Sequence, residues 1–373
     1  MRFKPVHSGR LERYLGRDKV EQISRNFKDW YGPPVHLVDV PGSVRVCGGG
    51  DFIGPFAAGY AASALDVAND FARRWWREIG RYQPALAASG FASVSDALAR
   101  ASGGFQQTLG PLVKSGPTTV TNQAGTLWRL GSSPAAGSVG PAAPAGTTQT
   151  SANTGAIVFN NPSVGSLRLT GADFSSTVVN ESLLIYDRLF SVAKTINSTA
   201  TEAVTGVPTR FQNTTSTSQD YAGGNFVFPE VGGTVLAGTA HNWTVCSYRN
   251  QANSAANIPS IAGVSASVID SLDLVAGSWF MPLAAGDSGI LSLTQMQCSA
   301  LVATGVISFV MGHPVGVMAF PVINSILPFN WLTSRNLAPY IPNNACLALL
   351  ILPAPTTTAA TFSGMLYGVS TSS

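Results

Sequence analysis

Charged side chains are scarce in this chain. Only 11% of its 373 residues are Asp, Glu, Lys or Arg, against roughly 25% in an ordinary soluble domain. The apolar content of 45% is ordinary, so the lack of charge does not indicate a disordered chain. A surface of Ser, Thr, Asn and Gly loses its water at low cost, and we expect its faces to be covered by other copies or subunits. A rigid β protein with a hydroxyl-rich exterior is the alternative.

The few charges are also unevenly placed. Residues 1–120 carry 15 Lys/Arg and 10 Asp/Glu, whereas residues 121–373 carry only 7 and 9. The net charge of the whole chain is only +3, which is too small to indicate nucleic-acid binding by itself. We therefore expect no direct contact with nucleic acid.

Cysteine and histidine are few, and neither forms a metal-binding pattern. The four cysteines and four histidines are scattered, without a C-x-x-C pair or two histidines at ligand spacing. We therefore predict buried free thiols made in a reducing cytosol, and no metal or other cofactor. The first ten residues lack the apolar stretch of a signal peptide, so secretion is not expected.

One uncharged run is long enough to cross a bilayer. No Asp, Glu, Lys or Arg occurs between Cys298 and Ser334. However, Pro314, Pro321 and Pro328 interrupt the run at regular intervals, with glycines between them. Breakers at this density indicate short strands with turns, and we expect no membrane contact.

The chain divides by composition into three parts. Residues 1–130 are basic and contain helix-like patterns, including a short helix near 93–101 that Ser93 and Asp96 are placed to cap. Residues 131–156 are uncharged and rich in Gly, Pro, Ala, Ser and Thr, which is typical of a linker or an extended arm. Residues 157–373 contain short β-like segments separated by turns, which predicts an antiparallel β-sandwich or jelly-roll-like domain.

Strands are expected wherever short apolar runs lie between turn residues. In the N-terminal part they fall at 35–38 and 44–46, around the Pro41-Gly42 turn. In the C-terminal part they fall near 156–160, 166–170, 182–191, 203–211, 225–236, 241–248, 264–275, 289–297, 301–311, 315–320, 346–352 and 361–369. The run 182–191 opens the β domain. Its neighbours Asp187 and Arg188 are interpreted as an ion pair at a strand end or a contact between subunits.

Two patterns superficially resemble catalytic ones. The sequence Gly286-Asp287-Ser288-Gly289 matches the tetrapeptide around the nucleophile of chymotrypsin-like proteases, but nothing around His241 matches that family's histidine motif. A turn is the simpler interpretation. The carboxylates are sparse, and one close pair does not define a glycosidase site. We predict that the protein is not an enzyme.

An arginine-rich helix near residues 63–82 is the best candidate for anchoring contacts. Arginine beside tryptophan can stack on and neutralise phosphates, although a solvated or inter-subunit face is more common. The predicted anchoring residues, in this helix and in the basic segment ahead of it, are Arg13, Arg17, Arg73, Arg74, Arg77, Trp75 and Trp76.

Several short stretches look familiar when they are taken in chain order. They are Leu11–Gly16, Trp30–Pro34, Val40–Gly42, Gly90–Asp96, Leu184–Phe190, Gly206–Arg210 and Ala284–Gly289. Together they resemble uncharacterised virion structural proteins of tailed bacteriophages. The resemblance spans most of the chain, but its motifs are structural and diagnose no chemistry.

The resemblance implies a particle component that is made in the bacterial cytoplasm and found in the virion. We expect a head-associated protein, such as a capsid-decorating (cement) or minor capsid protein, that binds copies of itself as a trimer or larger and other virion proteins. A major capsid protein is an alternative, although its usual long spine helix is not visible after residue 120. A tail, adaptor or fibre module is another; an exposed aromatic platform near Trp243, Trp279 or Trp331 would favour carbohydrate binding.

Overall fold

The computed structural model describes residues 36–40, 43–47, 90–210, 224–302, 305–332, 338–354 and 358–371. The chain forms two compact units, Met1–Pro84 and Ala85–Ser373. In the first unit, strands β1 (His36–Val40) and β2 (Ser43–Cys47) pair antiparallel across Pro41-Gly42. The predicted N-terminal hairpin is therefore confirmed.

The first described element of the second unit is a short helix, α5 (Val94–Arg100), and the chain continues through Ala101–Phe105 to a kink at Gly104, which has a positive φ of 91°. Ser93 caps the helix, because its hydroxyl accepts a hydrogen bond from the backbone N–H of Asp96 at 3.0 Å. The Asp96 carboxylate in turn accepts from the N–H of Ala92 at 2.9 Å. The capped helix predicted from the sequence is confirmed.

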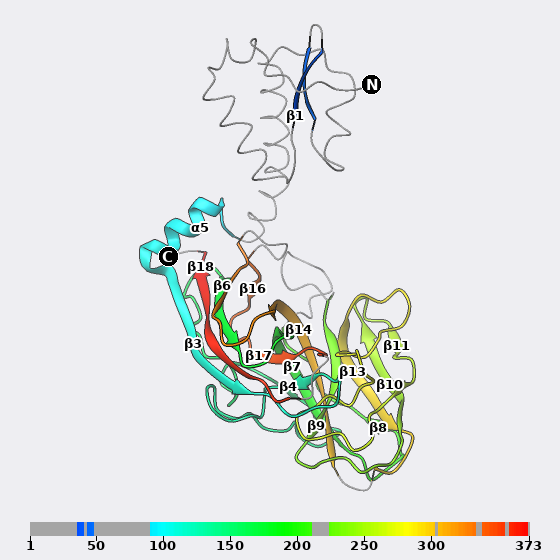
Figure 1. Cartoon of the computed structure of the whole chain (residues 1–373). Helices are drawn as coiled ribbons and strands as arrows, with labels where there is room; N and C mark the ends of the chain where they lie inside the picture. Colours follow the sequence, from blue (N-terminus) through cyan, green and yellow to red (C-terminus); the bar gives the residue numbers. More distant parts are fainter. Residues whose placement is uncertain are drawn as a thin grey trace. The chain divides into compact units, whose positions relative to one another are not determined.

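The described part of the second unit forms three antiparallel sheets (Figure 1). Sheet I has the order β15-β6-β18-β3, with β16 also on β6: β3 (Gln106–Ser115), β6 (Leu167–Ser176), β15 (Leu327–Asn330), β16 (Tyr340–Ile341) and β18 (Thr361–Ser370). Sheet II has the order β4-β17-β7-β14-β9, with β5 also on β7: β4 (Gly125–Thr126), β5 (Thr147–Thr148), β7 (Glu181–Thr195), β9 (Phe226–Gly232), β14 (Val306–Phe320) and β17 (Leu347–Ile351). Sheet III has the order β11-β10-β13-β8, with β12 also on β10: β8 (Glu202–Ala203), β10 (Asn242–Asn250), β11 (Ala255–Asn257), β12 (Ile261–Ala262) and β13 (Ile290–Cys298).

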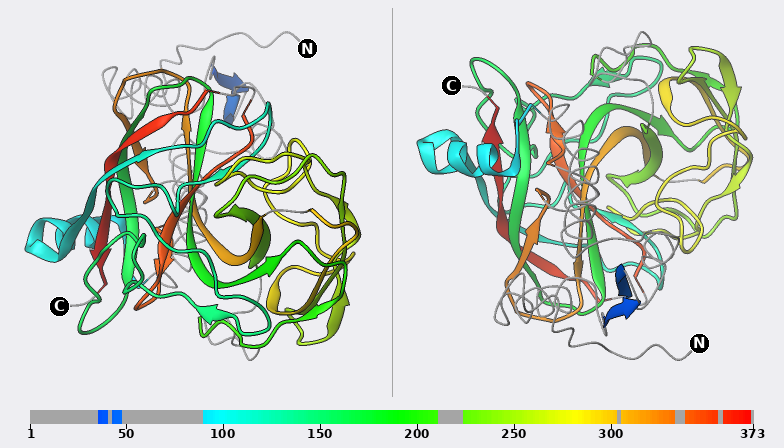
Figure 2. Two further views of the ribbon diagram at one scale, coloured as in Figure 1. Left: turned by 90° about the horizontal axis from the view of Figure 1, so that it is seen from below. Right: turned by 90° about the horizontal axis from the view of Figure 1, so that it is seen from above.

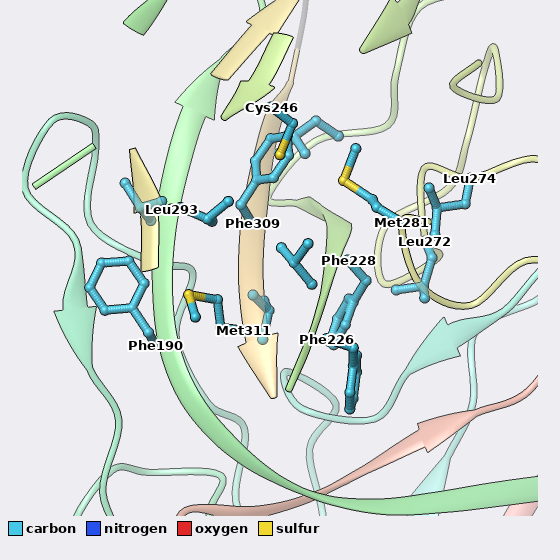
Figure 3. Close-up of a cluster of buried hydrophobic side chains, with 14 of the residues drawn as sticks. Phe190, Phe226, Phe228, Cys246, Leu272, Leu274, Met281, Leu293, Phe309 and Met311 are labelled. Atoms are coloured by element: carbon cyan, nitrogen blue, oxygen red, sulfur yellow. The ribbon is translucent and has the colours of Figure 1, made fainter. Parts of the chain in front are cut away.

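Sheet II is the middle layer. In both views of Figure 2, the yellow strands of sheet III and the cyan and red strands of sheet I lie on opposite sides of β7 and β14. One buried cluster, which we call the first core, joins sheets II and III; the second core joins sheets II and I. Figure 3 shows part of the first core around Phe309 and Phe228. The prediction of a mainly β, antiparallel sandwich-like fold is confirmed.

The burial of both faces of β7 explains why apolar and polar residues alternate only weakly in its sequence. Leu183 and Ile185 belong to the second core, whereas Leu184 and Tyr186 belong to the first. Successive side chains of a strand point to opposite faces, so a strand with a core on each face must be apolar throughout. The buried strand predicted at 182–191 is confirmed, and it extends from Glu181 to Thr195.

The Gly/Pro/Ala-rich segment 131–156 is an extended arm that lies on its own β body. Its backbone pairs with β7: Ala143 N–H donates to Ala193 at 2.8 Å, and β5 pairs with the same strand. A Cβ at Gly137 would collide with Trp128, and one at Gly146 with the ring of Phe190. These glycines let the backbone approach large side chains closely, so the composition reflects packing in this chain.

Several elements differ from the predictions. The β body starts near residue 85, well before the predicted start at residue 157, because β3 pairs with β18. The predicted strands 301–311 and 315–320 are one strand, β14, since a register shift accommodates Pro314. Segment 264–275 is irregular, and Asp270 has a positive φ of 69°. Residues 156–160 form no strand, and in the described part of the predicted strand 203–211 only Ala203 belongs to a strand, β8.

Candidate functional site: buried charge and a neutral exterior

The fold contains two charged residues in the middle of β7. Asp187 and Arg188 are both fully buried. They do not pair with each other, because adjacent residues of a strand point to opposite faces. The interpretation as an ion pair at a strand end is therefore wrong: each residue has its own partner, contributed by a segment more than twenty residues away.

Asp187 is held on its face by Arg210. The Arg210 guanidinium donates from Nε and Nη2 to the two carboxylate oxygens at 2.8 and 2.7 Å. The backbone N–H of Cys346, on the neighbouring segment before β17, also donates to Asp187 at 2.8 Å. This bidentate geometry is the strong form of an ion pair, and it fixes the loop that follows β8 to the middle sheet.

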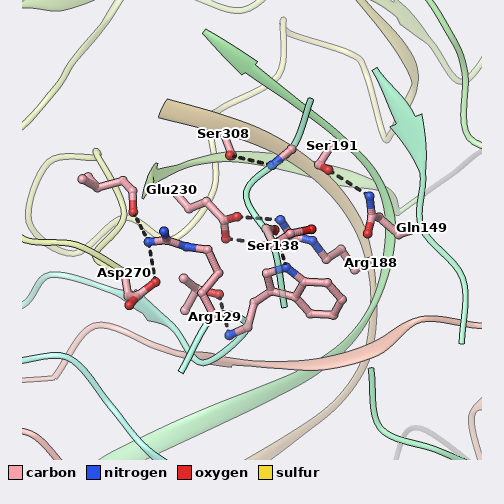
Figure 4. Close-up of polar contacts among 12 residues, drawn as sticks. Arg129, Ser138, Gln149, Arg188, Ser191, Glu230, Asp270 and Ser308 are labelled. Carbon is pink, nitrogen blue, oxygen red and sulfur yellow. Dashed lines mark hydrogen bonds and ion pairs between the residues drawn. The ribbon is translucent and has the colours of Figure 1, made fainter. Parts of the chain in front are cut away.

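Arg188 is held on the opposite face by Glu230 of β9. Its two terminal nitrogens donate to the two Glu230 oxygens at 3.1 and 2.5 Å, and its guanidinium lies 4.7 Å from the ring centre of Trp128 (Figure 4). Burial alone would lower the pKa of Arg188, but the charge of Glu230 raises it above its ordinary value. The Arg188 guanidinium therefore keeps its charge, and it lies beside the first core, next to Tyr186.

A third ion pair lies beside it. Arg129 donates at 2.6 Å both to the Asp270 carboxylate and to the backbone carbonyl of Val231. Burial raises the pKa of Asp270 to about 6, while Arg129 opposes the rise. The buried Lys114 ammonium donates at 2.5 Å to the carbonyl of Leu130, and burial lowers its pKa to about 8. These contacts hold the start of the arm and the edge of sheet II in place.

His241 and Asp273 form a fourth buried pair. Nε2 of the imidazole is 2.8 Å from the Asp273 carboxylate, and Nδ1 is 3.0 Å from the carbonyl of Thr239. Both ring nitrogens thus face acceptors, an arrangement that favours the doubly protonated imidazolium. Burial alone would lower the pKa of His241, but the hydrogen bond and charge of Asp273 raise it above its ordinary value. The indole of Trp243 also donates to Asp273, at 2.9 Å.

The protease-like tetrapeptide is a turn in front of β13. The Asp287 carboxylate accepts from the hydroxyl of Tyr248 at 2.6 Å and from the amide of Asn250 at 2.7 Å. These bonds fasten the turn to β10. Ser288 is exposed, and His241 has no nitrogen free to take its proton. The carboxylate of the motif therefore has a structural use.

The sequence contains two sets of residues that were expected at the surface, one for anchoring and one for an aromatic platform. The predicted anchoring residues, Arg13, Arg17, Arg73, Arg74, Arg77, Trp75 and Trp76, lie outside the described residues. Of the three tryptophans weighed as an aromatic platform, Trp243 and Trp331 are buried. Trp279 is half-buried and makes edge contacts with Phe226 and with the exposed Phe280.

The exterior is nearly free of charge. Seventeen Asp, Glu, Lys and Arg side chains fall within the described residues between 90 and 371, and six of them are half-buried. In this described part, Arg249 alone is exposed. Ten are buried: Lys114, Arg168, Glu181, Asp187, Arg188, Lys194, Arg210, Glu230, Asp270 and Asp273. Soluble proteins show the opposite arrangement, with most charges on the surface.

The described residues contain no group of three or more His, Cys, Asp or Glu side chains that could hold a metal ion. They also contain no helix with the length and apolar character needed to span a membrane.

No protein-family model, no curated protein and no solved structure matches the chain.

Sequence reasoning located the charged residues of β7 but not their partners. Arg210 lies 23 positions after Asp187, and Glu230 lies 42 positions after Arg188. Only the folded topology brings these partners together. One signal could have suggested burial: Asp187 and Arg188 interrupt an apolar run too long for a half-exposed strand. The near-neutral exterior was expected from composition, but the inward placement of the remaining charges was not.

Proposed function

We propose that the protein is a non-enzymatic structural component of a tailed-phage virion, assembled in the bacterial cytoplasm through contacts between subunits. Its position would be on the head, as a decorating, cement or minor capsid protein. The observation that carries the proposal is the nearly uncharged exterior of the β body, on which Arg249 is the one exposed charged side chain among the described residues.

A surface loses its bound water when a partner covers it. An exposed charge must lose its hydration when a partner covers it, and this cost is large unless a matching charge meets it. Hydroxyl and amide groups lose water at lower cost, and their hydrogen bonds can be replaced by others across the contact. A body whose described residues include one exposed charged side chain can thus be covered on several sides.

The interior supports a structural role as well. The buried ion pairs tie β7 to the loop after β8 and to β9 of the same sheet, and they tie the segment just before the arm to the irregular segment that contains Asp270. Breaking a buried pair is costly, because it leaves an uncompensated charge in the core. Such pairs therefore favour one fixed arrangement of the layers, which is what a repeated building block requires.

The alternatives differ in what supports them. For a major capsid protein one would expect a long spine helix, and in the described residues after 105 no α-helix occurs. For a fibre module that binds carbohydrate, the half-buried Trp279 beside the exposed Phe280 is the favourable observation. Two aromatic side chains on one loop are a small platform, so we rank this function second.

The proposal is tested by sedimentation velocity on the full chain and by mass spectrometry of purified phage particles. For contacts made by the β body, we expect an affinity that changes little between low and high salt, because its described surface exposes few charges. We also expect the chain in the particles at a fixed number of copies. A monomer at all concentrations that is missing from particles would contradict the proposal.

A further inference from the structure

Two neighbouring turns close one end of sheets I and II. One turn, residues 177–180, joins β6 to β7; the other, residues 321–326, joins β14 to β15. Backbone hydrogen bonds of 2.8 Å tie them to adjacent strand ends, from Asn180 to Phe320 and from Asn324 to Ser176. Both asparagines have positive φ angles, 62° and 53°, a conformation that asparagine tolerates better than most residues. The two turns are thus fixed next to each other.

These turns expose four aliphatic side chains. The exposed fractions are 43% for Val179, 50% for Val322, 47% for Ile323 and 72% for Ile326. All four are β-branched, so their side chains are already restricted and lose little freedom when a partner covers them. We call this group the apolar end. The hydrogen bonds between the turns and the adjacent strand ends bring these four residues to one end of the sheets, and neighbouring exposed aliphatic side chains are typical of interaction surfaces.

The charge around the apolar end restricts what can cover it. Neither turn contains a charged residue, and Glu181, which follows the first turn, is 3% exposed. A phosphate backbone, an anionic membrane or an acidic peptide needs basic groups to receive it. The surface that matches an uncharged apolar end, without leaving a buried charge unpaired, is one with the same character.

We propose that the apolar end is a contact between two copies of this chain, in which Val179, Val322, Ile323 and Ile326 of one copy meet the same residues of the other. A two-fold axis brings identical patches together, so a neutral patch needs no complementary partner. This inference rests on the proposed assembly function and names a surface that would serve it. The hydroxyl- and amide-rich surface around the patch forms the rim of the contact.

The test uses charge substitutions in the full chain. Ile326→Asp places a charge in the centre of the contact, and we expect self-association measured by sedimentation to weaken about tenfold or more. Val158→Asp is the matched control, because Val158 is 70% exposed on another loop. The next residues of that loop bond to Gln107, which pairs with Gly368 at the far end of β18, away from the apolar end. Thermal unfolding of both variants checks that the fold is retained.

A mixing experiment identifies the occupant. Ile326→Asp and Ile326→Lys copies each repel themselves, but a mixture pairs opposite charges if the patches meet each other. We expect the mixture to recover association that neither variant shows alone. Recovery supports the contact between copies, whereas no recovery overturns it.

The possible failures are distinguishable. If the unchanged chain self-associates and Ile326→Asp does so equally well, or if Val158→Asp weakens it as much, the apolar end is not the contact, and the assembly function stands. If the unchanged chain stays monomeric at all concentrations, the contact between copies fails, and self-assembly within the proposed function fails with it. If another virion protein covers the end, Ile326→Asp loses binding to particles without a change in self-association.

Discussion

Glu181 provides the sharpest test of the buried electrostatics. It is the first residue of β7 and is 3% exposed, and its Oε2 atom is buried without a hydrogen-bond partner. Burial raises the pKa of this carboxyl from 4.5 to about 7. A neutral carboxylic acid is tolerated in such a place far better than a carboxylate. The folded protein therefore keeps this proton at a pH where the unfolded chain has released it.

The sign and size of the effect of Glu181 on stability follow from the difference between its pKa in the folded and unfolded states. Since the pKa is higher in the folded state, the contribution to stability is complete below pH 4.5 and is lost as the pH rises through about 7. Each tenfold change in proton affinity is worth about 1.4 kcal/mol, so the full difference corresponds to about 3 kcal/mol. We expect about 2 kcal/mol in practice, because water reaches groups near a strand end. Glu181→Gln has no proton to lose and removes this dependence.

The assay is urea unfolding of the unchanged chain and of Glu181→Gln at pH 4.5 and pH 8. The quantity to compare is the difference in unfolding free energy between the two proteins at each pH. His241 and Asp270 titrate in both proteins, so their effects cancel in this difference. We expect the difference to shift in favour of the variant by about 2 kcal/mol at pH 8. An unchanged difference at the two pH values would refute the reasoning.

Three further outcomes are expected. Gly146→Ala forces a Cβ into an aromatic ring and should cost about 1–3 kcal/mol of unfolding free energy, whereas Gly238→Ala, which points into open space, should change it by less than about 0.5 kcal/mol. Arg188→Met strands the Glu230 carboxylate in the core and should cost about 3–5 kcal/mol in chemical unfolding; an unaffected midpoint would contradict the buried pair. The contribution of His241 to stability should be complete below pH 6.5 and should be lost as the pH rises through its raised pKa in the folded state. The melting temperature of His241→Asn should therefore vary less with pH across this range than that of the unchanged chain.

Local sequence patterns predicted the strands that are strongly apolar. The run around Leu184 is buried on both faces, and no arrangement other than a central strand suits it. Strand β3 was not predicted, because Gly110-Pro111 in its middle is typical of a break. Proline is accepted there because β3 is the last strand of sheet I, where a missing N–H costs little.

The buried charges could not be predicted in the same way. Whether Asp187 is exposed or paired depends on Arg210, and that contact depends on how the loop after β8 returns to β7. The arm 131–156 presented a similar difficulty: its composition is typical of a flexible linker, and only the position of Trp128 and Phe190 beneath it shows why glycine is needed. Composition therefore predicted a neutral exterior, whereas the tertiary contacts determine where the charges lie.

Strands β7 and β14 pass through both cores, each with fifteen residues. As a consequence, the two sandwiches share a backbone and cannot separate or melt independently: loss of one core removes a wall of the other. A single unfolding transition is the expected behaviour of such a body. A force applied to sheet I would reach sheet III through sheet II, because the same two strands line both cores.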